Sequence, residues 1–311
     1  MTRLDFDHTE KQFLGKRALQ DLTLSLEGEK IIGLLGRNGA GKTTAMKLAA
    51  GFLKPTGGEV RAFGEPVFNS LLASANTIYM AEDIRFPDTL PLTGILDELA
   101  RAYPNFDRKL AGRLADYFSL PSGAKHTALS KGMKNTFNLI AGLAARCPLT
   151  LLDEPLNGMD AVVRKDLTSV LLKEFIEAPR MIVLSGHQLQ GLEELFEEVA
   201  ILQDGRLRHH GEAESFRERF KRLTGSSETV RAATAGLHVR SRRETLPGMD
   251  EAIVELEPGT IFAPAGTDLA VSSLSLNDAY IAFTGGTEGG IDRVYADQTE
   301  SEDRHLPADR P

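Results

Sequence analysis

The sequence has little cysteine, no long apolar run and no excess of positive charge. Cys147 is the only cysteine in 311 residues, which excludes an internal disulfide framework and a metal site built from several cysteines. The longest weakly polar stretch, residues 139–152, is interrupted by Arg146 and Pro148, and a membrane span needs roughly 20 apolar residues. The first residues carry charges with no apolar segment behind them, so no secretory signal is predicted. These absences favour a cytosolic location.

The charge balance argues against a nucleic-acid-binding surface. The formal net charge is -8, whereas a chain that binds nucleic acid needs a basic stripe to neutralise phosphates. About half of this charge lies in residues 286–311, where seven Asp or Glu accompany three Lys or Arg. Because this segment also has few large apolar groups, it is predicted to be a disordered acidic tail. No nucleic-acid partner is expected.

Strand and helix patterns alternate along most of the chain. Short apolar runs typical of buried strands occur at residues 30–35, 149–152, 181–184 and 199–202, with helical patterns between them. Such alternation predicts a largely parallel sheet with helices on both faces. Residues 77–130 have a mostly helical pattern instead, which predicts a helical insertion in an α/β domain.

The pattern changes near residues 223–228, where Thr-Gly-Ser-Ser-Glu is typical of a linker. Beyond it, residues 230–271 resemble several short strands, and residues 276–283 resemble one helix. We therefore expect a first domain over residues 1–222 with a helical subdomain at about 84–145. A small C-terminal α+β domain over 223–285 and the tail over 286–311 are expected to follow.

The strongest motif lies where the strand at 30–35 ends. Residues 36–43 read Gly-Arg-Asn-Gly-Ala-Gly-Lys-Thr and match G-x-x-x-x-G-K-[ST], with a predicted helix directly after them. Glycines let successive N–H groups curl around phosphate oxygens, and the helix N-terminus adds its positive dipole end. A glycine turn that merely joined a strand to a helix would not need the lysine and the threonine. The residues expected to contact ATP are Gly36, Asn38, Gly39, Ala40, Gly41, Lys42, Thr43 and Thr44, with Lys42 on the β- and γ-phosphates and Thr43 on Mg²⁺.

A second motif ends the apolar strand at 149–152, where Asp153 and Glu154 follow in sequence. Carboxylates just past a buried strand lie at the carboxyl edge of the sheet, where ligands bind in open α/β folds. Asp153 is expected to hold Mg²⁺ through water, and Glu154 is expected to orient or deprotonate the attacking water. An incidentally acidic loop is the alternative for this pair taken alone.

Over residues 4–220 the motifs together resemble the nucleotide-binding subunit of an ABC transporter. The resemblance implies a P-loop NTPase cassette, with a mostly parallel sheet core, an antiparallel β subdomain and a helical insertion. It implies that Phe13 stacks on adenine, although a core phenylalanine is the alternative. It also implies that His187 contacts the γ-phosphate, although a lone histidine is more often part of the core.

Residues 129–133, Leu-Ser-Lys-Gly-Met, occupy the place of the family's signature sequence, and residues 157–160 resemble its D-loop. The resemblance implies that the Ser130 hydroxyl and the Gly132 N–H meet the γ-phosphate held by a partner's phosphate loop, so that ATP joins two cassettes. Glu82 replaces the family's usual glutamine and is expected to ligate Mg²⁺ through oxygen. Lys131 and Met133 also depart from the usual signature, in a form similar to bacterial export-type cassettes.

The resulting hypothesis is an ATP hydrolase that uses ATP and Mg²⁺ and pairs with an identical or related cassette. It would drive a separate transmembrane permease, most simply an exporter, from the inner face of the cell membrane, with Glu154, His187 and Lys42 as its catalytic residues. One alternative is a soluble ABC-type ATPase that acts on nucleic acid or the ribosome, although such relatives usually carry two cassettes or a long coiled coil. A P-loop kinase is a further alternative, but it would have no use for the signature.

Overall fold

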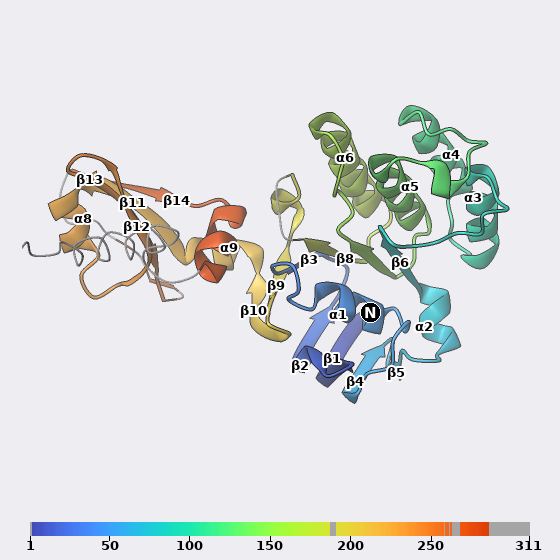
Figure 1. Cartoon of the computed structure of the whole chain (residues 1–311), viewed down its shortest axis with the longest axis horizontal. Helices are drawn as coiled ribbons and strands as arrows, with labels where there is room; N and C mark the ends of the chain where they lie inside the picture. Colours follow the sequence, from blue (N-terminus) through green and yellow to red (C-terminus); the bar gives the residue numbers. More distant parts are fainter. Residues whose placement is uncertain (1, 187–190, 258, 261, 263–267, 286–311) are drawn as a thin grey trace, which may run out of the picture. The chain divides into compact units, whose positions relative to one another are not determined.

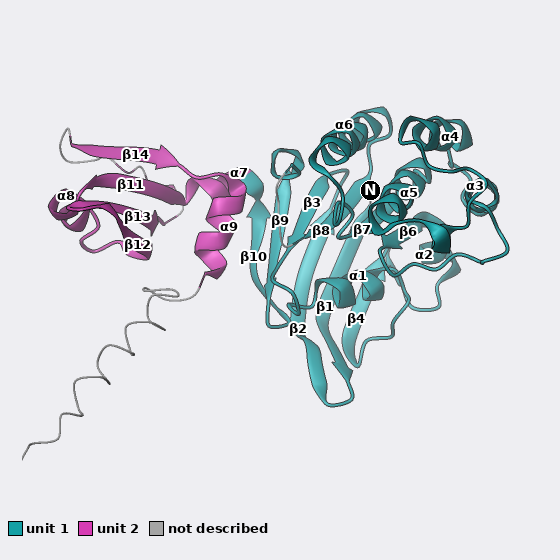
Figure 2. Ribbon diagram, turned by 45° about the horizontal axis from the view of Figure 1, so that its top comes forward, with its two compact units in different colours: residues 1–213 teal, residues 214–311 magenta. Residues whose placement is uncertain are grey.

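The computed structural model describes residues 2–186, 191–257, 259–260, 262 and 268–285, in two compact units over residues 1–213 and 214–311 (Figures 1 and 2). The first unit ends at Ala213, earlier than the predicted boundary at residue 222. The predicted linker at 223–228 is wrong, because these residues belong to strand β11 (Phe220–Ser226) and helix α8 (Ser227–Ala233). Its serines have a structural role, since the Ser226 hydroxyl caps α8 by accepting from the Thr229 N–H at 3.1 Å.

A six-stranded sheet forms the centre of unit 1, in the order β10-β9-β3-β8-β7-β6. The strands from β9 to β6 pair in parallel, and only β10 runs antiparallel. Their bounds are β3 Ile31–Leu35, β6 Thr77–Ala81, β7 Leu149–Asp153, β8 Met181–Gly186, β9 Glu198–Gln203 and β10 Arg206–Glu212. Strands β3, β6 and β7 are buried along their whole length, which is why they read as continuous rather than alternating apolar runs.

A second, antiparallel sheet has the order β2-β1-β4-β5, with β1 Arg3–Phe13, β2 Lys16–Glu27, β4 Gly57–Ala62 and β5 Glu65–Pro66. Helix α1 (Lys42–Ala49) contacts strands of both sheets and lies between them in Figure 2. Alternate leucines of β2 and the buried face of α1 share one apolar core with β3 and β7. This core fixes the position of the loop between β3 and α1.

Four helices follow one another in the segment between β6 and β7. They are α3 (Leu92–Ala102), α4 (Arg108–Tyr117), the 3₁₀ turn η1 (His126–Ala128) and α5 (Lys131–Ala144). Helix α5 is buried from Asn135 to Ala144 and contacts β6 and β7, while α3 and α4 lie outside it (Figure 1). The expected helical insertion is therefore carried on a helix that packs directly on the central sheet. Unit 1 also contains α2 (Leu71–Asn76), α6 (Ala161–Glu177) and η2 (Glu193–Leu195).

Unit 2 has its own four-stranded antiparallel sheet, in the order β12-β13-β11-β14. The remaining bounds are α7 Ala213–Glu218, β12 His238–Leu246, β13 Met249–Glu255, β14 Leu269–Ser273 and α9 Leu276–Thr284. A separate apolar cluster of Leu223, Val230, Ala252, Val254, Leu256 and Leu269 lies within it. The expected acidic tail falls outside the described residues. Within the part of the chain that the structure describes, no helix combines the length and apolar character that crossing a membrane requires.

Candidate nucleotide-binding site

The glycine-rich loop joins β3 to α1, as its sequence predicts. Two of its glycines are required by close packing: a Cβ on Gly36 would lie 2.6 Å from the Leu202 carbonyl oxygen, and one on Gly41 would lie 2.7 Å from that of Ala18. Gly41 also has a φ of 105°, a conformation that side chains disfavour. These contacts curl the loop tightly onto the sheet, so its N–H groups and the start of α1 form an anion-binding turn.

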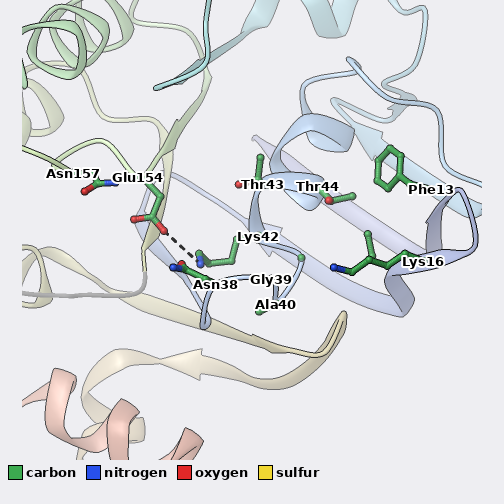
Figure 3. A pocket seen from close by; sticks show the side chains of 12 residues that line it. Phe13, Lys16, Asn38, Gly39, Ala40, Lys42, Thr43, Thr44, Glu154 and Asn157 are labelled. Carbon is green, nitrogen blue, oxygen red and sulfur yellow. Dashed lines mark ion pairs between the residues drawn. The ribbon is translucent and has the colours of Figure 1, made fainter. Parts of the chain in front are cut away.

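Lys42 is the first residue of α1, and its ammonium lies within the loop. Only 6% of the residue is exposed, and its Nζ donates to the Gly36 carbonyl oxygen at 2.7 Å. The same Nζ lies 3.5 Å from Glu154 Oε1 (Figure 3). A buried positive charge is thus held by acceptors that a bound phosphate oxygen can replace.

A cavity of about 430 Å³ opens beside this loop. Figure 3 shows Glu154 and Asn157 at one end of it and Phe13 and Lys16 at the other. Phe13 is 43% exposed, so it is not a core phenylalanine, and Lys11 Nζ lies 5.0 Å from its ring centroid. Apart from these four residues, the lining consists of Ala18, Asn38, Gly39, Ala40, Gly41, Lys42, Thr43 and Thr44. Sequence reasoning missed Lys16, which only the β1–β2 hairpin brings beside the loop.

The two carboxylates that follow β7 are held differently. Asp153 is buried and accepts hydrogen bonds from Ser185 Oγ and, at 3.1 Å, from Tyr79 Oη. Burial and the Asp153 charge raise the pKa of Tyr79, so the phenol stays protonated as a donor. Glu154 instead directs its side chain into the cavity, with a left-handed backbone at φ 51° and its N–H donating to Ser185 Oγ at 3.0 Å.

Ser185 and Tyr79 therefore hold the Asp153 carboxylate, and Ser185 also holds the backbone of Glu154. Neither residue was assigned this role from the sequence alone. A signal was present, because each is a polar residue inside an otherwise apolar strand that flanks β7. A polar group buried in a parallel sheet requires a partner, and the nearest strand end offers carboxylates.

The donor set suits a magnesium–nucleotide complex. Thr43 is exposed within the cavity, and Asp153 provides carboxylate oxygens at the end of β7, as this hard cation prefers. Glu82 is the exception, because its carboxylate already has a cationic partner in Lys131, whose Nζ lies 2.9 Å away. Asp153 and Glu82 are both absent from the described residues that line the cavity. His187 lies outside the described residues.

The signature residues lie at the start of α5. Ser130 caps this helix by accepting from the Met133 N–H at 3.3 Å. A Cβ on Gly132 would lie 2.9 Å from the Gly158 carbonyl oxygen, so the signature packs tightly against residues 157–160. Neither Ser130 nor Gly132 is among the described residues that line the chain's own cavity.

Comparison with known proteins agrees with this geometry. The ABC transporter family profile matches residues 19–157. The chain is 29% identical over 249 residues to the ABC transporter ATP-binding protein YtrB of Bacillus subtilis, covering 80% of this chain and 83% of YtrB. It is 30% identical over 217 residues to the uncharacterized ABC transporter ATP-binding protein MJ1023 of Methanocaldococcus jannaschii, covering 68% of this chain and 78% of that protein.

A solved structure described as the ATP-binding subunit of an ABC transporter superimposes with a TM-score of 0.62 at 25% identity, covering 69% of this chain and 92% of its own. These findings confirm the predicted P-loop cassette fold and the predicted family. Because unit 1 makes up about two thirds of the chain, the 80% coverage with YtrB extends into unit 2. The chain belongs to the ATP-binding proteins of ABC transporters, which are ATPases.

Proposed function

We propose that this chain hydrolyses MgATP in the cavity beside the glycine loop, in a dimer with an identical or related cassette, and thereby drives a separate membrane permease. The observation that carries the proposal is the meeting of three groups at one place. The Lys42 ammonium lies inside the glycine loop, and the Glu154 carboxylate faces it at 3.5 Å. Buried Asp153 lies at the same strand end. This combination suits phosphoryl transfer to water.

The chain's own residues have separate tasks in this reaction. The loop N–H groups and Lys42 bind the β- and γ-phosphates, and Phe13 offers its exposed ring to the adenine. Thr43 and Asp153 would hold Mg²⁺, with Glu82 as a further oxygen ligand once its carboxylate leaves Lys131, and the metal would supply positive charge as the phosphate bond breaks. Glu154 orients the attacking water and accepts its proton. His187 is proposed to contact the γ-phosphate.

Dimer formation is proposed because Ser130 and Gly132 stand apart from the cavity of their own chain. The start of α5 presents the Ser130 hydroxyl and the positive end of the helix dipole, which suit an anion brought by another molecule. A partner's bound triphosphate is such an anion. ATP would then be shared between two cassettes, and its cleavage would release them.

Coupling to the permease is proposed through the helical insertion, which directly follows Glu82. A second cavity of about 280 Å³ lies between β6 and α3, and it is lined largely by apolar side chains, among them Phe52, Ile84, Phe86, Leu99 and Tyr103. Apolar surface at the junction between insertion and sheet suits a helical segment of a permease. The export-type form of the signature favours outward transport.

Substitution of Glu154 by glutamine tests this function. Glu154→Gln retains the side-chain volume but removes the base, so ATP binding should persist, turnover should fall at least 100-fold, and a dimer should accumulate with MgATP. Lys42→Ala should instead weaken nucleotide binding. Unchanged hydrolysis in Glu154→Gln, or unchanged binding in Lys42→Ala, would contradict the assignment.

Purification of the tagged chain from detergent-solubilised membranes tests the partner. A polytopic membrane protein should accompany the chain, and the Glu154→Gln variant with ATP should retain it more strongly. Recovery of ribosomes or nucleic acid in its place would favour the alternative function.

A further inference from the structure

Two departures from the family pattern meet in space. Glu82 follows β6 and Lys131 is the first residue of α5, 49 positions later, yet the Lys131 Nζ lies 2.9 Å from Glu82 Oε2. Both side chains are about half exposed, at 51% for the lysine and 43% for the glutamate. The family's usual glutamine and glycine at these positions could form no such ion pair.

The stem of Lys131 also has a defined place. A Cβ built on Gly158 would lie 3.1 to 3.2 Å from three of its side-chain carbons, so the aliphatic chain lies directly over that glycine. Asn135, one turn further along α5, donates from Nδ2 to the Asn157 carbonyl oxygen at 2.7 Å. Helix α5 thus holds the 157–160 loop, and the lysine passes over this loop toward Glu82.

The backbone on the other side of the pair is fixed too. Asn138 Nδ2 donates to the Ala81 carbonyl oxygen at 2.8 Å, directly before Glu82. Its Oδ1 accepts from His126 Nε2 at 2.9 Å, in a buried position. Since the backbone before Glu82 is anchored, the half-exposed Glu82 side chain is the group that can rotate away from Lys131 to contact a different cation.

We propose that Lys131 is a positioning residue that competes with Mg²⁺ for the Glu82 carboxylate, and so sets how strongly nucleotide binding depends on the metal. This inference rests on the proposed role of Glu82 as a ligand of the metal. While paired with Lys131, Glu82 is neutralised and does not repel an incoming triphosphate. When Mg²⁺ accompanies the nucleotide, the carboxylate must leave the lysine to reach the metal. The lysine therefore favours metal-free nucleotide and opposes the metal complex.

The expected effect follows from the exposure of the pair. Ion pairs at this exposure contribute about 0.2–1 kcal/mol. The upper half of that range corresponds to about a two- to fivefold change in a dissociation constant. The measured quantity is the dissociation constant of a fluorescent ATP analogue in EDTA divided by its dissociation constant in Mg²⁺. A merely structural change alters both constants alike and leaves their ratio unchanged.

Lys131→Met should raise this ratio about two- to fivefold in the full-length chain. The same substitution in a Glu82→Gln background should leave the ratio unchanged, because the carboxylate that is contested is gone. Lys131→Arg keeps a cation within reach and should retain the parent ratio. Lys134→Met, on the same helix, is the matched control and should also retain it. At about 1 M salt, where charges are screened beyond roughly 3 Å, the effect of Lys131→Met should shrink.

An unchanged ratio in Lys131→Met would overturn the inference, as would an equal change in the Glu82→Gln background. The Lys42→Ala variant separates this failure from failure of the proposed function. If Lys42→Ala loses nucleotide binding while Lys131→Met leaves the ratio unmoved, the nucleotide site stands and the competition does not. If Lys42→Ala binds the analogue as the parent does, both proposals fall.

Discussion

Replacement of Ser185 by alanine should separate catalysis from nucleotide binding. The Ser185 hydroxyl donates to the Asp153 carboxylate and accepts from the backbone N–H of Glu154 at 3.0 Å, so one atom positions the Asp153 side chain and the Glu154 backbone. The residue is 2% exposed, and no water can readily substitute for the lost hydroxyl. Ser185→Ala should therefore fold with an intact phosphate loop, while Asp153 and Glu154 lose the hydrogen bonds that hold them in position.

The magnitude follows from the two lost bonds. A hydrogen bond to a charged group contributes about 1.5–3 kcal/mol, and an unsatisfied N–H costs about 1–3 kcal/mol. Relaxation of the left-handed backbone at Glu154 offsets part of this, since such a conformation costs roughly 1–3 kcal/mol. We expect a net destabilisation of about 2–4 kcal/mol. Misplacement of Glu154 by about 1 Å should lower kcat about 100-fold.

The assay is steady-state ATP hydrolysis together with nucleotide titration and urea unfolding. The dissociation constant for ATP should change less than about threefold, because Lys42 and the loop glycines make no bond to Ser185. Tyr79→Phe is the matched control, since it removes a donor from Asp153 only and should raise the Mg²⁺ requirement with a smaller loss of kcat. A folded Ser185→Ala protein with the parent kcat would refute the reasoning.

Three further outcomes are expected. Gly36→Ala places a Cβ 2.6 Å from the Leu202 carbonyl oxygen, so it should weaken ATP binding at least tenfold by displacing the loop; parent affinity in a titration would contradict this. Burial lowers the pKa of His126 from its ordinary value of 6.5, so below about pH 6.5 the unfolded chain takes up this proton more readily than the folded chain. Stability should therefore decrease as the pH is lowered, and a smaller decrease of the urea midpoint in His126→Gln would confirm that His126 is the source. Burial raises the pKa of Cys147 to about 12, so at pH 8 a thiol reagent should label it only after unfolding, and rapid labelling of the native protein would contradict its burial.

The central fold was predictable because its strands are short, fully buried apolar runs separated by helical patterns. The strand β6 was not predicted, since Tyr79 and the following Glu82 and Asp83 obscure its apolar character within a helical region. The predicted linker failed for a related reason. Ser226 and Ser227 look like loop residues, yet one caps a helix and the other hydrogen-bonds Asp250 from the start of that helix. Serine is favoured both in loops and at helix N-termini, because in each its hydroxyl can hydrogen-bond a nearby backbone group, so the sequence alone does not separate the two.

The phosphate loop and the acidic pair were predictable because their chemistry depends on neighbours in sequence. The pairing of Glu82 with Lys131 was not, since it depends on how α5 lies against β6. Each residue was recognisable alone as a departure from the family pattern. Only the packing of the helix on the sheet shows that the two departures neutralise each other.

Helix α5 is the element that connects the parts of this site. Asn135 and Asn138 are three residues apart, a spacing that places them on neighbouring positions of one helix surface, and each is buried. Asn135 donates to the 157–160 loop and Asn138 to the backbone before Glu82. Because a buried amide without its partner is costly, a shift of α5 must carry both loops with it or break these bonds. The helix that is proposed to present Ser130 to a partner cassette is therefore tied by hydrogen bonds to both loops of its own cassette. In the proposed dimer, these bonds would give a physical route by which contact at one site alters the other.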